Sequence, residues 1–259
     1  MHSRGTMRRI LHTALLLAIV GGASHSALQA QVARYRVTST AMLSLDRVNE
    51  APLVDTVTTS ALLFITIPAA APAIATLAID SLQLASTGMV RRAPDAFSRG
   101  TSVSAALTDG RPRITGDSTT ACTAERPLAA LLPDLLPLLP TPLRADQQWS
   151  DTLSVTTCRA SLPVTTISIV TSRTLTGMDS STVLLERRAV IRTTGSIAIR
   201  DQLVTLDGTG TGESLSTVLV ATRQIQSHRG SQTLDFSITN GQQTRRMVQR
   251  ITDSASLQP

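Results

Sequence analysis

The 259-residue sequence has no lysine and only five aromatic residues. P-loop proteins, Schiff-base enzymes and Ser-x-x-Lys enzymes each depend on a lysine amine, so the chain belongs to none of these classes. The aromatic residues are too few to line a sugar cleft, and they do not alternate with arginines as in a nucleic-acid-binding surface: Tyr35, Phe64, Phe97, Trp149 and Phe236. We therefore expect neither a glycosidase nor a nucleic-acid-binding protein.

Histidine is also scarce, and three of the four residues, His2, His12 and His25, lie near the start of the chain. The fourth, His228, lies in "IQSHRGSQ", which indicates an exposed junction between a strand and a turn. The first three lie in the stretch that we interpret below as a signal peptide, so only His228 remains in the mature chain. A single histidine excludes a multi-histidine metal site, and no G-x-S-x-G motif of a serine hydrolase accompanies it. We expect no enzyme activity, and therefore no catalytic residue, no metal site and no cofactor.

The stretch "DGTGTGE" (residues 207–213) has the glycine content of a phosphate-binding loop. Such a loop needs a helix directly after it, because the N–H groups of the first helical turn hold the phosphate. The sequence that follows, "SLSTVLVATR", has the β-branched composition of a strand instead. We interpret residues 207–213 as a Gly/Thr turn or a β-bulge.

The chain begins "MHSRGTMRRILHTALLLAIVGGASHSALQA". Arg4, Arg8 and Arg9 precede a short apolar run and a small-residue site at Ala30, which is typical of a secretory signal peptide over residues 1–30. The run is shorter than the roughly 20 residues of a membrane-spanning helix, so an N-terminal anchor is the weaker interpretation.

The remaining 21 arginines and 18 acidic residues give residues 31–259 a net charge of +3, and no later stretch is apolar enough to span a membrane. We predict a periplasmic or secreted bacterial protein.

Cys122 and Cys158 are the only cysteines. An even pair in an exported chain is typical of a disulfide, and we predict that these two residues form one. Two buried thiols are the other interpretation. Two sulfur ligands alone do not complete a tetrahedral metal site.

The remainder of the sequence favours β-strands, with 37 threonines and many valines and isoleucines. In "QTLDFSITN" the alternation places Leu234, Phe236 and Ile238 on one face of a strand. The stretch "TSALLFITI" (residues 59–67) is apolar on both faces and predicts a central strand, and the Asp-Gly pair at residues 109–110 predicts a hairpin. About a dozen such segments predict an all-β fold with one large curved antiparallel sheet, as an open half-barrel or a sandwich-like form.

One segment breaks the β pattern: "LAALLPDLLPLLP" (residues 128–140) holds seven leucines and three prolines. We predict that the Leu/Pro segment (residues 124–144) forms a short helix and a Pro-rich turn that plugs the open side of the sheet. It interrupts a single β domain of residues 31–259. The segment either fills the core or forms a lid over a cavity for an apolar ligand. The lid and wall residues would then be Leu131, Leu132, Leu135, Leu136, Leu139, Leu63 and Phe64.

The motif "LPTPLRADQQWSDTL" (residues 139–153) resembles a turn found in uncharacterised exported bacterial β proteins, with a Pro-rich apolar run, a polar turn, Trp149 and a strand. Residues 145–148 here replace the Gly-Asp turn of that group. The late stretch "GTGTGESLSTVLVATRQI" is also similar. The group resembles the open half-barrel folds of periplasmic lipoprotein carriers. This resemblance implies a concave face that holds acyl chains, and it implies no catalytic residue.

The sequence thus supports a non-enzymatic exported protein that binds a hydrophobic ligand, a lipid or acyl chain, between the curved sheet and the Leu/Pro segment. The alternative is a structural or protein-interaction module of the cell envelope with no small-molecule ligand. The first hypothesis predicts a cavity under the Leu/Pro segment, and the second predicts a filled core there together with an exposed strand edge for a protein partner.

Overall fold

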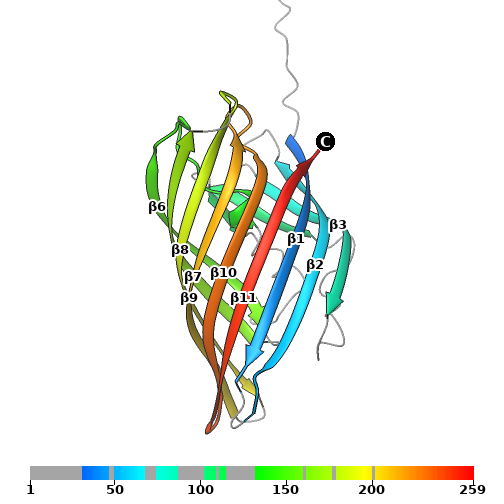
Figure 1. Ribbon diagram of the computed structural model, residues 1–259, viewed down its shortest axis with the longest axis vertical. Helices are drawn as coiled ribbons and strands as arrows, with labels where there is room; N and C mark the ends of the chain where they lie inside the picture. Colours follow the sequence, from blue (N-terminus) through cyan, green and yellow to red (C-terminus); the bar gives the residue numbers. More distant parts are fainter. Residues whose placement is uncertain are drawn as a thin grey trace, which may run out of the picture.

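The computed structural model describes residues 31–46, 50–67, 74–86, 102–108, 111–114, 132–159, 162–176, 179–199 and 202–259. These residues form one short helix, α2 (Leu132–Leu135), and 11 strands of a single antiparallel sheet (Figure 1). The strands are β1 (Gln31–Leu45), β2 (Leu53–Ile67), β3 (Ile74–Ser86), β4 (Ser102–Thr108), β5 (Arg111–Ile114), β6 (Gln148–Arg159), β7 (Leu162–Thr176), β8 (Thr182–Ile199), β9 (Gln202–Leu219), β10 (Ile225–Asn240) and β11 (Gln243–Gln258).

The strand order is β5-β4-β3-β2-β1-β11-β10-β9-β8-β7-β6, so β1 and β11 lie side by side at the centre. The two outer strands, β5 and β6, are consecutive in the chain. The connection between them therefore has to run from one edge of the sheet to the other. This topology explains why the Leu/Pro segment lies in the middle of the sequence. The prediction of an all-β fold with a large, open, curved antiparallel sheet is confirmed.

Alternation of side chains separates the two faces of the sheet. In β10, Leu234 and Phe236 are buried on the concave face, while Thr233 on the outer face is exposed. β4 and β5 pair as a hairpin, with Thr108 opposite Arg111, as the Asp-Gly pair predicts. Much of the outer face consists of short polar side chains, including cross-strand threonine pairs such as Thr239 with Thr244 at 3.0 Å.

Glycines in β9 allow the sheet to coil tightly. A Cβ atom at Gly210 would lie 2.2 Å from the carbonyl oxygen of Thr233, and one at Gly208 would lie 2.3 Å from the Cβ of Phe236. The side chains of β10 therefore occupy the space that a β9 side chain would need. The interpretation of residues 207–213 as a turn or bulge is wrong, because these residues lie inside β9 and pair with both neighbouring strands. Their glycines serve the curvature of the sheet.

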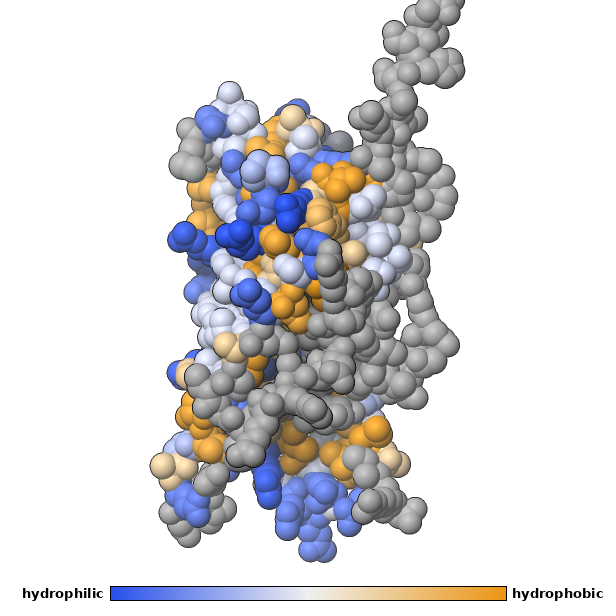
Figure 2. Space-filling model, turned by 90° about the vertical axis from the view of Figure 1, so that its right-hand side faces the viewer, coloured by the Kyte–Doolittle hydropathy of each residue, from blue (hydrophilic) through white to orange (hydrophobic). Residues whose placement is uncertain are grey.

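The curvature gathers the apolar side chains of the concave face into two clusters. The first lies under the described part of the Leu/Pro segment and draws on strands from β1 to β11, with Tyr35, Leu63 and Leu185 among its most buried members. The second takes its buried residues from β7 to β10, with Leu43 of β1 and Met247 of β11 packed against them. Six neighbouring strands contribute to this second cluster, which a flat sheet would not allow. Figure 2 shows hydrophobic side chains in patches over both the upper and the lower part of this face, with hydrophilic side chains at the lower tip.

Candidate functional site

The described part of the Leu/Pro segment lies against the first apolar cluster. Leu135, Leu139 and Leu143 are all buried there, at a spacing of four residues, and pack with the core residues of the sheet. Leu63, a predicted wall residue, belongs to the same cluster and is fully buried. The structure therefore brings Leu63, Leu135 and Leu139 of the predicted site together.

The other predicted site residues are placed differently. Leu136 is half-buried and packs at the margin of the cluster. Phe64 follows Leu63 in β2 and so points to the opposite, outer face, where the guanidinium of Arg34 lies 5.4 Å from its ring centroid. Leu63 and Phe64 cannot both line one wall. Leu131 and the side chain of Leu132 lie outside the described residues.

Two arginines from the sheet side hold the backbone of the Leu/Pro segment. Arg187 of β8 donates to the carbonyl oxygen of Pro133 at 3.1 Å and to the carboxylate of Asp134 at 2.9 Å. Arg223, in the turn between β9 and β10, donates to the carbonyl oxygen of Leu139 at 2.6 Å and to the hydroxyl of Thr141 at 2.8 Å. The segment is thus clamped at both ends of its described apolar stretch by side-chain contacts.

The end of the segment is fixed by Thr174 of β7, which is fully buried. Its hydroxyl donates to the carbonyl oxygen of Arg144 and accepts from the backbone N–H of Gln147 at 2.9 Å. The side chain of Gln147 bridges the turn, because it accepts from the N–H of Arg144 and donates to the carbonyl oxygen of Pro142. Asp146, at φ 59°, completes this turn before β6 begins.

A shallow pocket lies between the Leu/Pro segment and β6–β8. Its lining is mainly apolar with three polar residues at one side: Pro133, Leu136, Leu138, Trp149, Asp151, Leu153, Val170, Ser172 and Arg187. Its volume is about 10 Å³, room for about one water molecule, whereas ligand pockets typically hold roughly 300–1,000 Å³. This pocket is therefore not the cavity that the ligand-binding hypothesis predicts under the Leu/Pro segment. The buried Leu135, Leu139 and Leu143 give the filled packing that the alternative predicts there.

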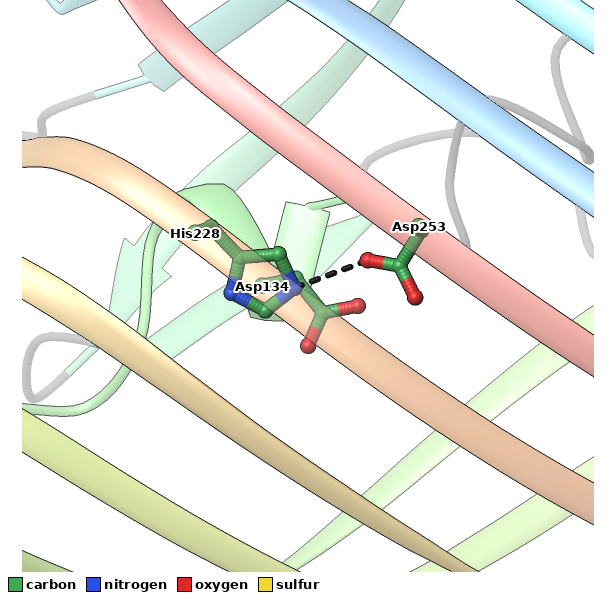
Figure 3. Close-up of side chains that lie close together, drawn as sticks. All are labelled: Asp134, His228 and Asp253. Carbon is green, nitrogen blue, oxygen red and sulfur yellow. Dashed lines mark hydrogen bonds and ion pairs between the residues drawn. The ribbon is translucent and has the colours of Figure 1, made fainter.

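A buried polar group lies beside α2 on the concave face (Figure 3). The Nδ1 atom of His228 lies 2.9 Å from the hydroxyl of Ser216, and its Nε2 atom lies 2.8 Å from a carboxylate oxygen of Asp253. Ser216 and His228 are register partners on β9 and β10, and Asp253 comes from β11. Asp134 of α2 brings a second carboxylate to the same place.

The prediction that His228 lies at an exposed strand-to-turn junction is wrong. His228 lies inside β10 and is only 3% exposed. It has the same parity in the strand as Leu234 and Phe236, so the alternation pattern extended by six residues would have placed it on the buried face. The polar residues on both sides of His228 obscured this alternation in the sequence.

Ser216, His228 and Asp253 include the residue types of a nucleophilic triad, but their burial argues for a different role. Ser216 is buried, and its hydroxyl contacts the imidazole from beneath the Leu/Pro segment. A catalytic nucleophile must reach a substrate carbonyl. The serine hydroxyl instead fixes the orientation of the histidine ring.

Sequence reasoning missed Arg187, Asp134 and Arg223, although two of them carried a signal. Arg187 shares its parity with Val183, Leu185 and Ile191 on the buried face of β8. A charged residue at such a position requires a partner. Asp134 is the one acidic residue among the leucines of residues 128–140, and it is that partner.

Two predictions rest on residues outside the described part of the chain. The signal peptide falls on residues 1–30, and the disulfide involves Cys122 and the side chain of Cys158. Both stay predictions. Among the described residues, no helix has the length and hydropathy that crossing a membrane would require.

Comparisons with known proteins identify no family: no family model matches the chain, and no curated protein matches it. Among solved structures, lipovitellin superposes with a TM-score of 0.48 at 14% identity over 90% of this chain. This chain spans 25% of the length of that lipovitellin chain. OccK2 of Pseudomonas aeruginosa, solved with glucuronate, gives a TM-score of 0.26 at 6% identity over 88% of this chain and 99% of its own. OccAB1 of Acinetobacter baumannii gives 0.20 at 8% identity over 85% and 65% of the two chains.

Proposed function

We propose that this protein is exported, is not an enzyme, and binds an apolar ligand, a lipid or other acyl chain, between the concave face of its sheet and the Leu/Pro segment. The observation that carries the proposal is the separate apolar layer over an open sheet. Leu135, Leu139 and Leu143 are buried against the core, yet their segment is held by the side-chain clamps of Arg187 and Arg223. The resemblance to half-barrel lipoprotein carriers implies the same use of the concave face.

The ligand enters by taking the place of leucine side chains. The pocket beside β6 marks the entry, because its lining is apolar and Leu136 and Leu138 at the margin of the segment are only half-buried. The acyl chain leaves water as the displaced leucines enter it, so binding is favourable when the chain buries more apolar area than those leucines expose.

Ligand binding can be tested with a dansyl-labelled long-chain fatty acid and the chain as exported from a bacterial host. A wild-type chain that binds the probe, with binding weakened at least about tenfold by Leu136→Asp, supports the proposal, since the new carboxylate would lie in the apolar pocket. Leu215→Asp is the matched control, because Leu215 is exposed on the outer face of β9. Equal binding by the wild type and Leu136→Asp would exclude this site.

Native mass spectrometry of the same material tests for a natural cargo. A bound mass that organic extraction removes supports a carrier and identifies the class of its ligand. A chain whose mass begins at Gln31 supports the signal peptide, and a mass two hydrogens lower than the reduced chain supports the disulfide.

A second candidate function is a protein-interaction module of the cell envelope. The observation that favours it is a cross-strand pair on the outer face, Ile169 with Val190, 54% and 65% exposed, beside the edge strand β6. Exposed apolar patches next to a strand edge are typical of protein contacts. A photo-cross-linker at position 169 in exporting cells should then give a defined adduct, and one at Thr211 should not.

A further inference from the structure

Three metal-ligating side chains meet where the Leu/Pro segment contacts the sheet. One donor atom of Asp134, one of His228 and one of Asp253 all lie within 4.8 Å of one another. Figure 3 shows the three side chains converging from α2, β10 and β11. They are far apart in the sequence, so only the fold assembles them.

Gly230 leaves space at this point. It lies opposite Asp253 in the pairing of β10 with β11. A Cβ atom on Gly230 would lie 2.8 Å and 3.2 Å from the two carboxylate oxygens of Asp253 and 3.2 Å from the Nε2 atom of His228. The position is therefore surrounded by oxygen and nitrogen donors, and any side chain at residue 230 would obstruct it.

Ser216 prepares the histidine for a ligand on its other side. The serine hydroxyl lies 2.9 Å from Nδ1, so Nε2 is the ring atom that faces the carboxylates. When Nδ1 carries the proton and donates to the serine oxygen, Nε2 presents its lone pair toward Asp253 and Asp134. A metal-ligating histidine normally makes such a hydrogen bond through its second ring nitrogen, which fixes the tautomer and the ring orientation.

The local charge also favours a cation. Asp134 and Asp253 bring two carboxylates to the imidazole, and Arg187 compensates one of them through a single oxygen of Asp134. One negative charge remains beside a histidine that is almost completely buried. Two carboxylate oxygens and one imidazole nitrogen are ligands that Zn²⁺ accepts, with solvent in a fourth position.

We propose that Asp134, His228 and Asp253 bind one divalent transition-metal ion, of which Zn²⁺ is the type. On binding, the Nε2 lone pair of the Nδ1-protonated tautomer of His228 coordinates the ion, which then lies between this nitrogen and the carboxylate of Asp253. Because Asp134 belongs to the Leu/Pro segment and the other two ligands belong to the sheet, the ion ties the segment to the sheet. The site does not depend on the proposed function, since metal binding is measured without an apolar ligand.

The test is isothermal titration of Zn²⁺ into the exported, oxidised full chain, stripped beforehand with a chelator. The expected result is one equivalent bound with a Kd below about 1 µM. His228→Gln, which can still hydrogen-bond to Ser216, should weaken binding at least about a hundredfold because it lacks the imidazole lone pair. Asp134→Asn should weaken it as well.

The matched control is Asp207→Asn, because Asp207 is exposed on the outer face of β9. This variant should bind Zn²⁺ with the same affinity as the wild type. Circular dichroism of each variant confirms that the sheet is retained. If the His228 variant is not folded, the Asp134 variant, whose carboxylate is 42% exposed, serves as the test. A wild-type chain that binds no Zn²⁺, or a folded ligand variant that binds it equally well, overturns the proposal.

Discussion

The guanidinium of Arg187 lies 2.9 Å from a carboxylate oxygen of Asp134, and this ion pair joins β8 to the Leu/Pro segment. Arg187 is buried on the concave face, whereas its neighbour Arg188 is exposed on the outer face. The two arginines are adjacent in the sequence but differ in burial and in partner, since Arg187 pairs with Asp134 and Arg188 pairs with Glu186. They therefore form a natural pair for testing how the segment is held.

Arg187→Met should lower the free energy of unfolding by about 1–3 kcal/mol, measured by urea denaturation. The loss is smaller than the roughly 3–5 kcal/mol for breaking a fully buried ion pair, because the Asp134 side chain stays partly in water. Arg188→Met should change the stability by less than about 0.5 kcal/mol. Equal effects of the two substitutions would show that the contact to Asp134 contributes nothing.

Gly210→Ala should destabilise the protein by at least about 2 kcal/mol, since its Cβ would lie 2.2 Å from a backbone oxygen that cannot move without breaking the pairing of β9 with β10. Gly212→Ala is the control in the same strand, because its nearest neighbour would lie at 3.5 Å, an ordinary contact. Thermal unfolding of both variants distinguishes them. A tolerated Gly210→Ala would mean that β9 does not approach β10 as closely as described.

Thr174→Val should cost about 1–3 kcal/mol, because it leaves the N–H of Gln147 and the carbonyl oxygen of Arg144 without their buried hydroxyl partner. The turn at residues 144–147 should also become sensitive to limited proteolysis, which reports on this end of the Leu/Pro segment directly. Thr171→Val, an exposed position in the same strand, should have neither effect.

Stability should fall at alkaline pH because of Tyr35. Burial raises the pKa of its hydroxyl from 10.0 to about 12, and a hydrogen bond with the backbone of Ile225 only partly opposes this. The unfolded chain loses the proton near pH 10 while the folded chain keeps it, so stability is complete below about pH 10 and declines as pH approaches about 12. The total loss is about 3 kcal/mol for a two-unit shift.

Tyr35→Phe should remove most of this decline, measured as urea midpoints across the alkaline range. The sequence makes the experiment clean, because Tyr35 is the only tyrosine and there is no lysine that titrates in the same range. Ultraviolet absorbance of tyrosinate gives the folded-state pKa directly. An ordinary tyrosine titration near pH 10 in the folded protein would contradict the burial of this side chain.

Side-chain alternation predicted the sheet well because each strand has one buried and one solvated face. Leu234 and Phe236 in β10 lie on the buried face that the sequence pattern assigns to them. The prediction for His228 was wrong because composition was given more weight than parity. The prediction for residues 207–213 was wrong because glycine is typical of turns, and the sequence does not reveal that a neighbouring strand will occupy the Cβ position.

The clamps on the Leu/Pro segment depend on tertiary contacts that no local pattern contains. Asp134 and Arg187 lie 53 residues apart, and Arg223 and Leu139 lie 84 residues apart. The position of the plug could be predicted, since an apolar non-β segment must find a surface to cover. Its partners could not, because they depend on how eleven strands curl around it.

The pairing of β1 with β11 at the centre of the sheet means that β11 joins the two halves of the protein. Removal of β11 would leave two five-stranded arms, β1–β5 and β6–β10, each made of strands that neighbour one another in the chain. Such local hairpins form early, while a pairing such as Arg34 with Gln258 has to close the longest loop and forms late. A partly folded chain therefore has two aggregation-prone edges at its middle, and the docking of the arms is the step that a folding helper would have to protect.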